Sequence, residues 1–241
     1  MYNTDFWHKH NLYGKKIILF LFCCISLHSL AQRNVLENDI KFARRPYHFG
    51  IHLAANMGDY KINHSALFAA SDSVLAITNK LGVGFEIGAL FSYHINKYLE
   101  LRTVPSFSFT SKNLEFTFSD ESKKKKDIPQ IYFDFPIEIK FKSQPLRDIK
   151  VYAIGGLKYG YDIGGNINDR KKTGMPHQKL NDFGVVYGVG LEIHFPLFIL
   201  SPEIKAFNSV LNIHKQDQEI FAPYIKGLYN RTFTFSINFE G

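Results

Sequence analysis

Histidines and carboxylates at alternating positions are the residues of this chain that could do chemistry. The histidines of interest are His48, His52, His94 and His194. Glu86 and Glu192 fall on the same polar face of alternating segments. A histidine held between a carboxylate and a serine can act as a general base, as in a lipase or a lipid A deacylase. Whether these histidines can do so depends on where the surrounding elements place them.

A metal site is the second kind of chemistry that these residues suggest. His48 and His52 would share one face of a strand, but four residues of extended chain separate them by roughly 13 Å. One ion could not bind both side chains at that distance. Enzymes built on barrels place their catalytic side chains at the lipid-facing surface, where this chain has inert residues. We therefore expect structural ion pairs, with no catalytic residue, no metal, no cofactor and no small-molecule substrate.

The stretch of residues 130–141 shows the pattern that must position these groups. Successive side chains of a strand point to opposite faces, and here every odd position is apolar while several even positions are charged. The length fits a tilted strand that crosses a membrane, which takes about 9–11 residues. The apolar face, which we predict to meet lipid, consists of Ile131, Phe133, Phe135, Ile137, Ile139 and Phe141.

The same alternation recurs in eight segments, which begin near residues 47, 83, 99, 131, 151, 183, 200 and 233. Long connections at about residues 58–81, 119–128, 162–182 and 208–227 alternate with short ones. Long loops on one side and tight turns on the other are typical of outer-membrane barrels. The sequence therefore predicts an all-β fold over residues 46–241, an eight-stranded antiparallel transmembrane β-barrel with an up-and-down meander. Its short turns and both termini would face the periplasm.

Glycines and charges indicate which face is inside. Eight glycines share the charged face, and the crowded interior of a small barrel needs small residues, whereas a solvated strand face gains nothing from glycine. A soluble lipocalin-like barrel would reverse the two faces. Buried charges persist only when they are paired. We therefore predict an interior network of ion pairs made by Glu86, Glu100, Arg102, Asp134, Glu138, Lys140, Lys158, Glu192, Glu203 and Lys205.

The first 45 residues have a different character. Lys15 and Lys16 precede an apolar run over residues 17–25, and Ala31 ends a short stretch of small residues, which is the layout of a secretory signal peptide. We expect residues 1–31 to be cleaved and residues 32–45 to form a periplasmic tether. The alternative is a retained anchor helix. Both cysteines, Cys23 and Cys24, lie inside the predicted signal peptide, so the mature chain would have no disulfide.

The positive charge of the chain is mild and mostly local. The formal net charge is +7, and the one block of like charge is Lys123, Lys124, Lys125 and Lys126. Such a block could bind anionic lipopolysaccharide, but a solvated loop accounts for it as well. Nothing resembles a nucleic-acid-binding module, and export argues against that role.

Four blocks of sequence together resemble the PorT/SprT family of Bacteroidetes outer-membrane proteins. They cover residues 45–50, 101–109, 133–143 and 151–160. Glu138 departs from the aliphatic residue expected in the third block. The resemblance implies a non-enzymatic component of the type IX protein secretion system, needed to bring cargo with a C-terminal signal to the cell surface. It also implies a link to gliding motility in some species. Its partners would be outer-membrane lipid and other components of that system.

Three other functions stay open on the residues alone. A general adhesive or structural barrel would act through its long extracellular loops. A lipid-modifying barrel enzyme would use the histidines. A soluble barrel would carry the same alternation with its faces exchanged.

Overall fold

The structure, a computed structural model, describes residues 45–65, 74–118, 123–164, 179–214 and 225–241. The predicted signal peptide and almost all of the predicted tether lie outside these residues. No helix in the described part is long and apolar enough to span a membrane. The described strands are β1 (Tyr47–His64), β2 (Val74–Lys80), β3 (Gly82–His94), β4 (Leu99–Thr103), β5 (Ser106–Phe118), β6 (Lys123–Lys142), β7 (Ile149–Asp162), β8 (Asn181–His194), β9 (Ile199–Ser209) and β10 (Ile225–Glu240).

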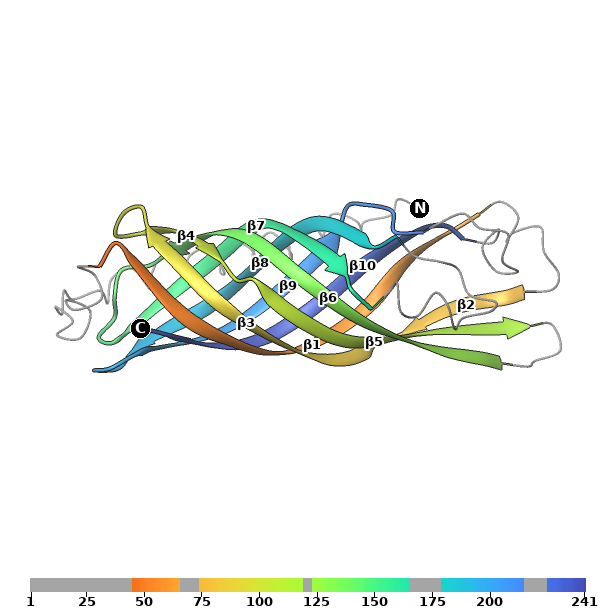
Figure 1. Ribbon diagram of the computed structural model, residues 1–241, viewed down its shortest axis with the longest axis horizontal. Coiled ribbons are helices and arrows are strands. Elements are labelled where there is room, and N and C mark those ends of the chain that lie inside the picture. The colour runs from red at the N-terminus through yellow and green to blue at the C-terminus, as the bar shows by residue number, and fades with distance from the viewer. Residues whose placement is uncertain (1–44, 66–73, 119–122, 165–178, 215–224) are drawn as a thin grey trace, which may run out of the picture. The chain divides into compact units, whose positions relative to one another are not determined.

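Hydrogen bonds between antiparallel neighbours close these strands into a barrel (Figure 1). From β1 the wall runs through β10, β9, β8, β7 and β6, then to β4 with β5, and then to β3. β3 pairs with β1 again, so the wall has no gap. The first and last strands lie side by side, with Gly50 opposite Glu240. The predicted all-β antiparallel barrel with an up-and-down meander is therefore confirmed.

The predicted number of eight strands is wrong, because the described residues form ten. Prolines cause one of the two breaks. β4 ends at Thr103 and β5 begins at Ser106, yet both pair with β3 and β6 in a continuous register. Pro105 lies in the gap, and this register puts Val104 opposite Pro136. Neither proline has a backbone N–H to donate to the hydrogen-bond ladder between strands. β4 and β5 are therefore separate strands that together fill one position in the barrel wall, between β3 and β6.

A bulge causes the other break, between β2 and β3. The pairing of β2 with β5 ends at Lys80 and Asn113, and the pairing of β3 with β5 begins one residue out of step. An extra residue on one strand produces such a shift. At Gly82 a Cβ atom would collide with the carbonyl oxygen of Ser111, so glycine permits the close approach of the two backbones. β2 and β3 therefore also share one wall position.

Parts of two predicted loops are strand. The connections expected at residues 58–81 and 119–128 contain the end of β1, all of β2 and the beginning of β6. β5 and β6 pair from Thr117 and Lys123 onwards, whereas β6 pairs with β7 only from Tyr132. As Figure 1 shows, β2, β5 and β6 therefore project beyond the rest of the barrel wall. β5 itself continues through residues 114–118.

The alternation separates an apolar outer face from a polar interior. Val83 and Phe233 on the outside are 70% and 60% exposed. Arg102, Glu138 and Lys140 on the inside are at most 1% exposed. Each strand therefore carries the pattern of a barrel wall with one face turned outward and the other inward.

Two consecutive glycines in β7 show how crowded the interior is. Around Gly155, which points outward, a Cβ atom would meet nothing within 4 Å. Around Gly156, which points inward, a Cβ atom would collide with the backbone carbonyl oxygen of Ile137. The small residue is required on the inside only, as expected for a narrow barrel that side chains fill.

Short turns close one end of the barrel, which we call the short-turn end, and the opposite end is the long-loop end. In the turn of residues 95–98, Asn96 Oδ1 accepts hydrogen bonds from the backbone N–H groups of Tyr98 and Leu99 at 2.8 and 2.9 Å. A hydrogen bond from Lys97 lowers the pKa of the exposed Tyr98 hydroxyl below its usual value. Asparagine side chains stabilise tight turns in this way, so local sequence fixes this end of the barrel.

Candidate functional site

The centre of the barrel holds an arginine between two glutamates. Arg102 on β4 donates to Glu138 Oε2 on β6 from Nε at 3.0 Å and from Nη2 at 2.7 Å. On its other side it donates to both carboxylate oxygens of Glu203 on β9. Lys205 Nζ lies 3.6 Å from each of the two carboxylates. Charge-assisted bonds of this kind fix both distance and orientation, so this cluster ties opposite walls of the barrel together.

Tyr152 on β7 extends the central cluster. Its hydroxyl donates to Glu203 Oε1 at 2.7 Å, and its ring lies 4.1 Å below Lys140 Nζ. The ring needs space on the next strand, because a Cβ atom at Gly190 would lie 2.5 Å from it. Gly190 therefore makes room for the aromatic ring that joins the central cluster to the ions at the short-turn end.

The short-turn end holds a second cluster, in which lysines lie among three glutamates. Lys140 Nζ lies 2.5 Å from Glu192 Oε1, and 3.6 Å from both Glu100 Oε2 and Glu240 Oε1. Lys142 donates to Glu100 and lies 4.0 Å from Glu192. Each carboxylate has at least one cation within reach, which is the condition for burying such charges.

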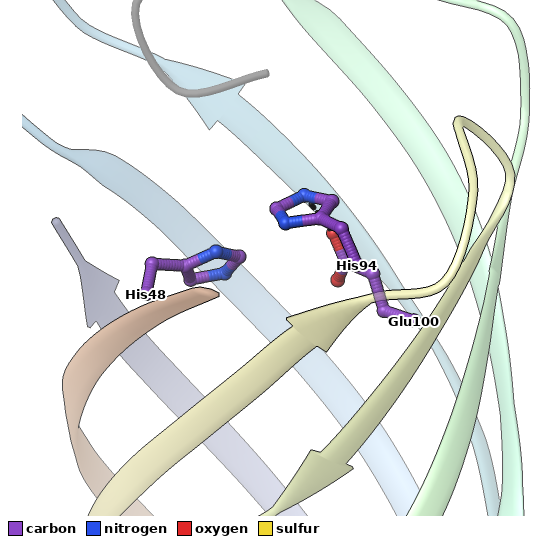
Figure 2. Close-up of side chains that lie close together, drawn as sticks. All are labelled: His48, His94 and Glu100. Atoms are coloured by element: carbon purple, nitrogen blue, oxygen red, sulfur yellow. Dashed lines mark ion pairs between the residues drawn. The ribbon is translucent and has the colours of Figure 1, made fainter. Parts of the chain in front are cut away.

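Histidines from two strands meet at this same end. Figure 2 shows His48, His94 and Glu100, which come from β1, β3 and β4. Their rings and carboxylate supply one ligand atom each within 4.8 Å of one another. His94 Nε2 lies 2.6 Å from Glu100 Oε1, and His48 Nε2 lies 2.7 Å from Glu240 Oε2. The spacing of His48 and His52 in the sequence did not indicate this group, because its second histidine lies on a neighbouring strand.

A third cluster lies toward the long-loop end. Lys158 Nζ lies 2.9 Å from Asp134 Oδ2, and its ammonium lies 4.2 Å from the centre of the Phe207 ring. Glu86 accepts a hydrogen bond from Ser106 at 2.5 Å and lies 3.5 Å from His52 Nε2. The ten residues predicted for the interior network thus lie inside the barrel. Nine of them have a partner of opposite charge, and Glu86 lies beside His52.

Side chains leave little space between these clusters. A cavity of about 20 Å³ near the long-loop end is lined by residues that include Asn56, Lys112, Asp182 and Asn230. Asn230 joins two of them, since it accepts from Lys112 at 2.7 Å and donates to Asp182 at 2.6 Å. Such a cavity has room for about one water molecule. In the described residues, ion pairs at the centre and toward both ends line the inside of the barrel.

The six apolar residues predicted to meet lipid lie on the outside of β6. Phe135, Ile137, Ile139 and Phe141 are 42%, 53%, 53% and 57% exposed. Ile131 and Phe133 are half-buried, and the Phe133 ring packs against Phe107 with 5.3 Å between ring centres. This outer face is a continuous apolar surface along the strand.

Several interior residues were missed by the sequence reasoning. Lys142 and Glu240 belong to the cluster at the short-turn end, and Lys112 and Asp182 to the other end. The alternation did carry a signal for three of them, since Lys142, Asp182 and Glu240 each continue the even positions of a predicted strand by one step. They were missed because the predicted strands stop one residue short, at the end before Lys142 and Glu240 and at the start after Asp182.

This arrangement can hold the walls together and exclude water. Among the described residues, it does not place a series of reactive side chains around an open cleft. Of the described histidines, His48, His52 and His94 are all turned toward interior partners. None of these three lies on the apolar outer surface where a lipid substrate would lie. The geometry is that of a closed, strongly stabilised wall.

Comparisons with known proteins place this fold among membrane proteins. Residues 31–213 match the family described as "Outer membrane protein beta-barrel domain". A similar solved structure is the outer membrane protein OprG from Pseudomonas aeruginosa, with 10% identity, a TM-score of 0.45, and coverage of 81% of this chain and 95% of that chain. Another is Ail, the attachment invasion locus protein of Yersinia pestis, in complex with the heparin analogue sucrose octasulfate. It has 13% identity, a TM-score of 0.40, and coverage of 82% and 100%. No curated protein matches the chain.

Proposed function

We propose that this chain, which belongs to the outer membrane protein β-barrel domain family, is a non-enzymatic component of the type IX protein secretion system. The proposal rests on the resemblance of four sequence blocks to the PorT/SprT family. As a member of the β-barrel domain family, the chain lies in the outer membrane of a Gram-negative bacterium and crosses it with many strands. Its task would be to support the delivery of cargo with a C-terminal signal to the cell surface. In species that glide, it would also support motility.

The observation that carries this proposal is where the PorT/SprT-like blocks lie. Residues 101–109, 133–143 and 151–160 lie in β4, the beginning of β5, the second half of β6 and most of β7 in the barrel wall. These blocks contribute Arg102, Glu138 and Tyr152 to the central cluster. The resemblance therefore includes Arg102 and Tyr152 of the central cluster, whereas Glu138 departs from it.

The packed interior favours a role through partners rather than through the lumen. Arg102 bridges two carboxylates across the centre, and the cavity near the long-loop end has room for about one water molecule. A folded cargo protein could not pass through such a barrel. We therefore expect contacts with other secretion components at the short turns and at the tether of residues 32–45.

A clean deletion tests the proposal most simply. We expect cargo with a C-terminal secretion signal to accumulate in the periplasm of the deletion strain and to return to the surface when the wild-type chain is supplied. The control is an outer-membrane protein that does not use this route, which should be inserted normally in both strains. Normal surface display of the cargo in the deletion strain would contradict the proposal.

A second function is favoured by the shape of the long-loop end. β2, β5 and β6 project beyond the paired wall and offer backbone surface above the membrane (Figure 1). An adhesive or structural barrel would use such a surface. Exchanging this projection for a short turn would then abolish binding to surfaces while secretion stayed normal. Loss of secretion in the same variant would favour the first function.

An enzymatic role in lipid modification is the third possibility. It has less support, because His48, His52 and His94 lie inside the barrel. Each of these histidines faces a carboxylate there, that of Glu240, Glu86 and Glu100 respectively. We expect the lipid A of the deletion strain to have an unchanged mass spectrum. A new or missing lipid A species, restored by the wild-type chain, would show that the barrel acts on lipid.

A further inference from the structure

We propose that His48, His94 and Glu100 bind a divalent transition-metal ion of the zinc class at the short-turn end of the barrel. Each of the three supplies one ligand atom, and these atoms lie within 4.8 Å of one another (Figure 2). The ion would link β1, β3 and β4. This site goes beyond the proposed function, and neither depends on the other.

Strand register brings the three side chains together. His94 pairs directly with Glu100 in the antiparallel ladder of β3 and β4. His48 pairs with Ser92 on β3, two residues before His94. Residues two apart in a strand lie on the same face, so all three side chains point into the barrel at one level. The cluster is therefore a product of the backbone and does not need an unusual rotamer.

Unpartnered polar atoms gather at this point, which is an independent observation. The Nδ1 atoms of His48 and His94 are buried and have no hydrogen-bond partner among the described residues. The same holds for Ser92 Oγ, opposite His48. His48 is only 3% exposed, so its ring is shielded from bulk solvent. Buried polar side chains nearly always have partners, and a metal ion bound at Nδ1 of His48 would supply one for that ring.

Glu240 orients His48 in the way that metal-binding histidines require. His48 Nε2 donates to Glu240 Oε2 at 2.7 Å, which leaves Nδ1 free to bind an ion. Metal ligands of this type usually donate their second ring N–H to a carboxylate, and that bond fixes the tautomer and raises the basicity of the ligand. Glu240 lies at the end of β10, so the carboxylate connects the last strand to the site.

The donor set selects the class of ion. Two imidazoles and one carboxylate are the ligands of many zinc sites, and they leave a fourth position for water. Ligands around a tetrahedral ion at about 2.0–2.1 Å lie roughly 3.3 Å apart. The bond of 2.6 Å between His94 Nε2 and Glu100 Oε1 would therefore open, and the widest separation of 4.8 Å would narrow.

Lys142 and Lys140 both compete with this ion, since Lys140 Nζ also lies 3.6 Å from Glu100 Oε2. Lys142 donates to Glu100, so its ammonium neutralises part of the negative charge that would attract a metal ion. Access is available beside it, because the His94 side chain is 18% exposed and is the last residue of β3, next to the turn of residues 95–98. An ion can therefore reach the cluster from the short-turn end without passing along the lumen.

The test uses the mature chain, refolded in detergent without a histidine tag and treated with a chelator. Titration with zinc should give one ion per chain. His94→Gln should weaken binding by more than about 100-fold, and Glu240→Gln, which removes only the orienting carboxylate, by about 10–100-fold. Lys142→Met should strengthen binding, because it removes one of the two competing cations from Glu100. His52→Gln is the matched control, since His52 is buried on β1 but outside the cluster.

A measurement on the wild-type chain keeps the proposal testable if the variants fold poorly. Cobalt in place of zinc is paramagnetic and should broaden the ring NMR signals of His48 and His94 first. Zinc should also raise the temperature at which the wild-type barrel unfolds, because binding to the folded state alone stabilises it. Absence of a bound ion in the wild type, or broadening at other histidines, would overturn the proposal. So would equal loss of affinity in His52→Gln and His94→Gln.

Discussion

At the scale of single residues, the interior depends on one arginine. Arg102 is at most 1% exposed and satisfies Glu138 and Glu203 at once. Removing one member of a buried ion pair leaves an uncompensated charge, which is far more costly than the loss of the contact. The stability of the barrel should therefore respond to this side chain more than to any surface charge.

Arg102→Met should lower the free energy of unfolding by about 3–5 kcal/mol. The matched control is Arg231→Met, because Arg231 also makes a two-bond pair, with Asp59 at 2.9 and 2.6 Å, but its side chain is 44% exposed. An exposed pair contributes about 0–1 kcal/mol, so the control should change little. Denaturant titration of the barrel in lipid vesicles measures both. Equal losses in the two variants would show that burial does not decide the effect.

Glycines at neighbouring positions provide a second residue-scale prediction. Gly156→Ala should destabilise the barrel by about 1–3 kcal/mol, because its Cβ atom would collide with the Ile137 carbonyl oxygen and overpack the interior. Gly155→Ala should be neutral or slightly stabilising, because its Cβ atom would meet nothing within 4 Å. The same denaturant titration compares them. A larger loss for Gly155→Ala would mean that the two faces of β7 are exchanged.

Residue-scale prediction from the sequence succeeded where it needed only alternation. The even positions of residues 130–141 indicated Asp134, Glu138 and Lys140, which lie inside. Alternation does not give register, and without register nothing indicates that His48 and His94 meet across two strands. The ligand cluster was therefore beyond sequence reasoning, although each of its members had been placed on the inner face.

At the scale of elements, the structure differs from the expected eight-stranded barrel at the ends of strands and at two breaks within strands. Pro105 and Pro136 are visible in the sequence, but the break follows from Val104 lying opposite Pro136, which again depends on register. The bulge before Gly82 likewise depends on how closely β5 approaches. Alternation that continues past the membrane level looks the same as alternation within it. For that reason the projection of β2, β5 and β6 was assigned partly to loops.

Hydrogen exchange should separate the projection from the wall. The backbone amides of β2 and of the first residues of β6 lie in a sheet that does not continue into β7. Fewer neighbours and more solvent lower the free energy of local opening. We expect these amides to exchange faster than those in the middle of β7 and β8, as measured by NMR or mass spectrometry in detergent. Equal protection would indicate that the projection is covered.

At the scale of the whole molecule, the barrel is closed in two senses. Its wall closes because β1 pairs with both β3 and β10, and its interior closes because ion pairs occupy each level from Glu240 to Asp134. An open antiparallel edge could not be satisfied in lipid. A barrel with eight wall positions has an interior that side chains can fill.

Planar-bilayer recording tests whether side chains close the interior of the barrel to ions. The wild-type chain should show no steady ion conductance, because its described interior is packed with side chains. Arg102→Gly together with Glu138→Gly and Glu203→Gly would open the centre and should produce measurable current if the barrel still folds. A stable open channel in the wild type would contradict the packed interior and would weaken the argument that the barrel acts through partners.

The assignment of the two faces is the claim on which the rest depends, and Phe135 on β6 tests it most directly. Phe135 is 42% exposed on the outer, apolar face near the middle of its strand. Phe135→Arg would place a charge in lipid and should lower the free energy of unfolding in vesicles by about 2–4 kcal/mol. Phe135→Leu, which stays apolar, should change it far less. A neutral result for Phe135→Arg would mean that this face does not meet lipid.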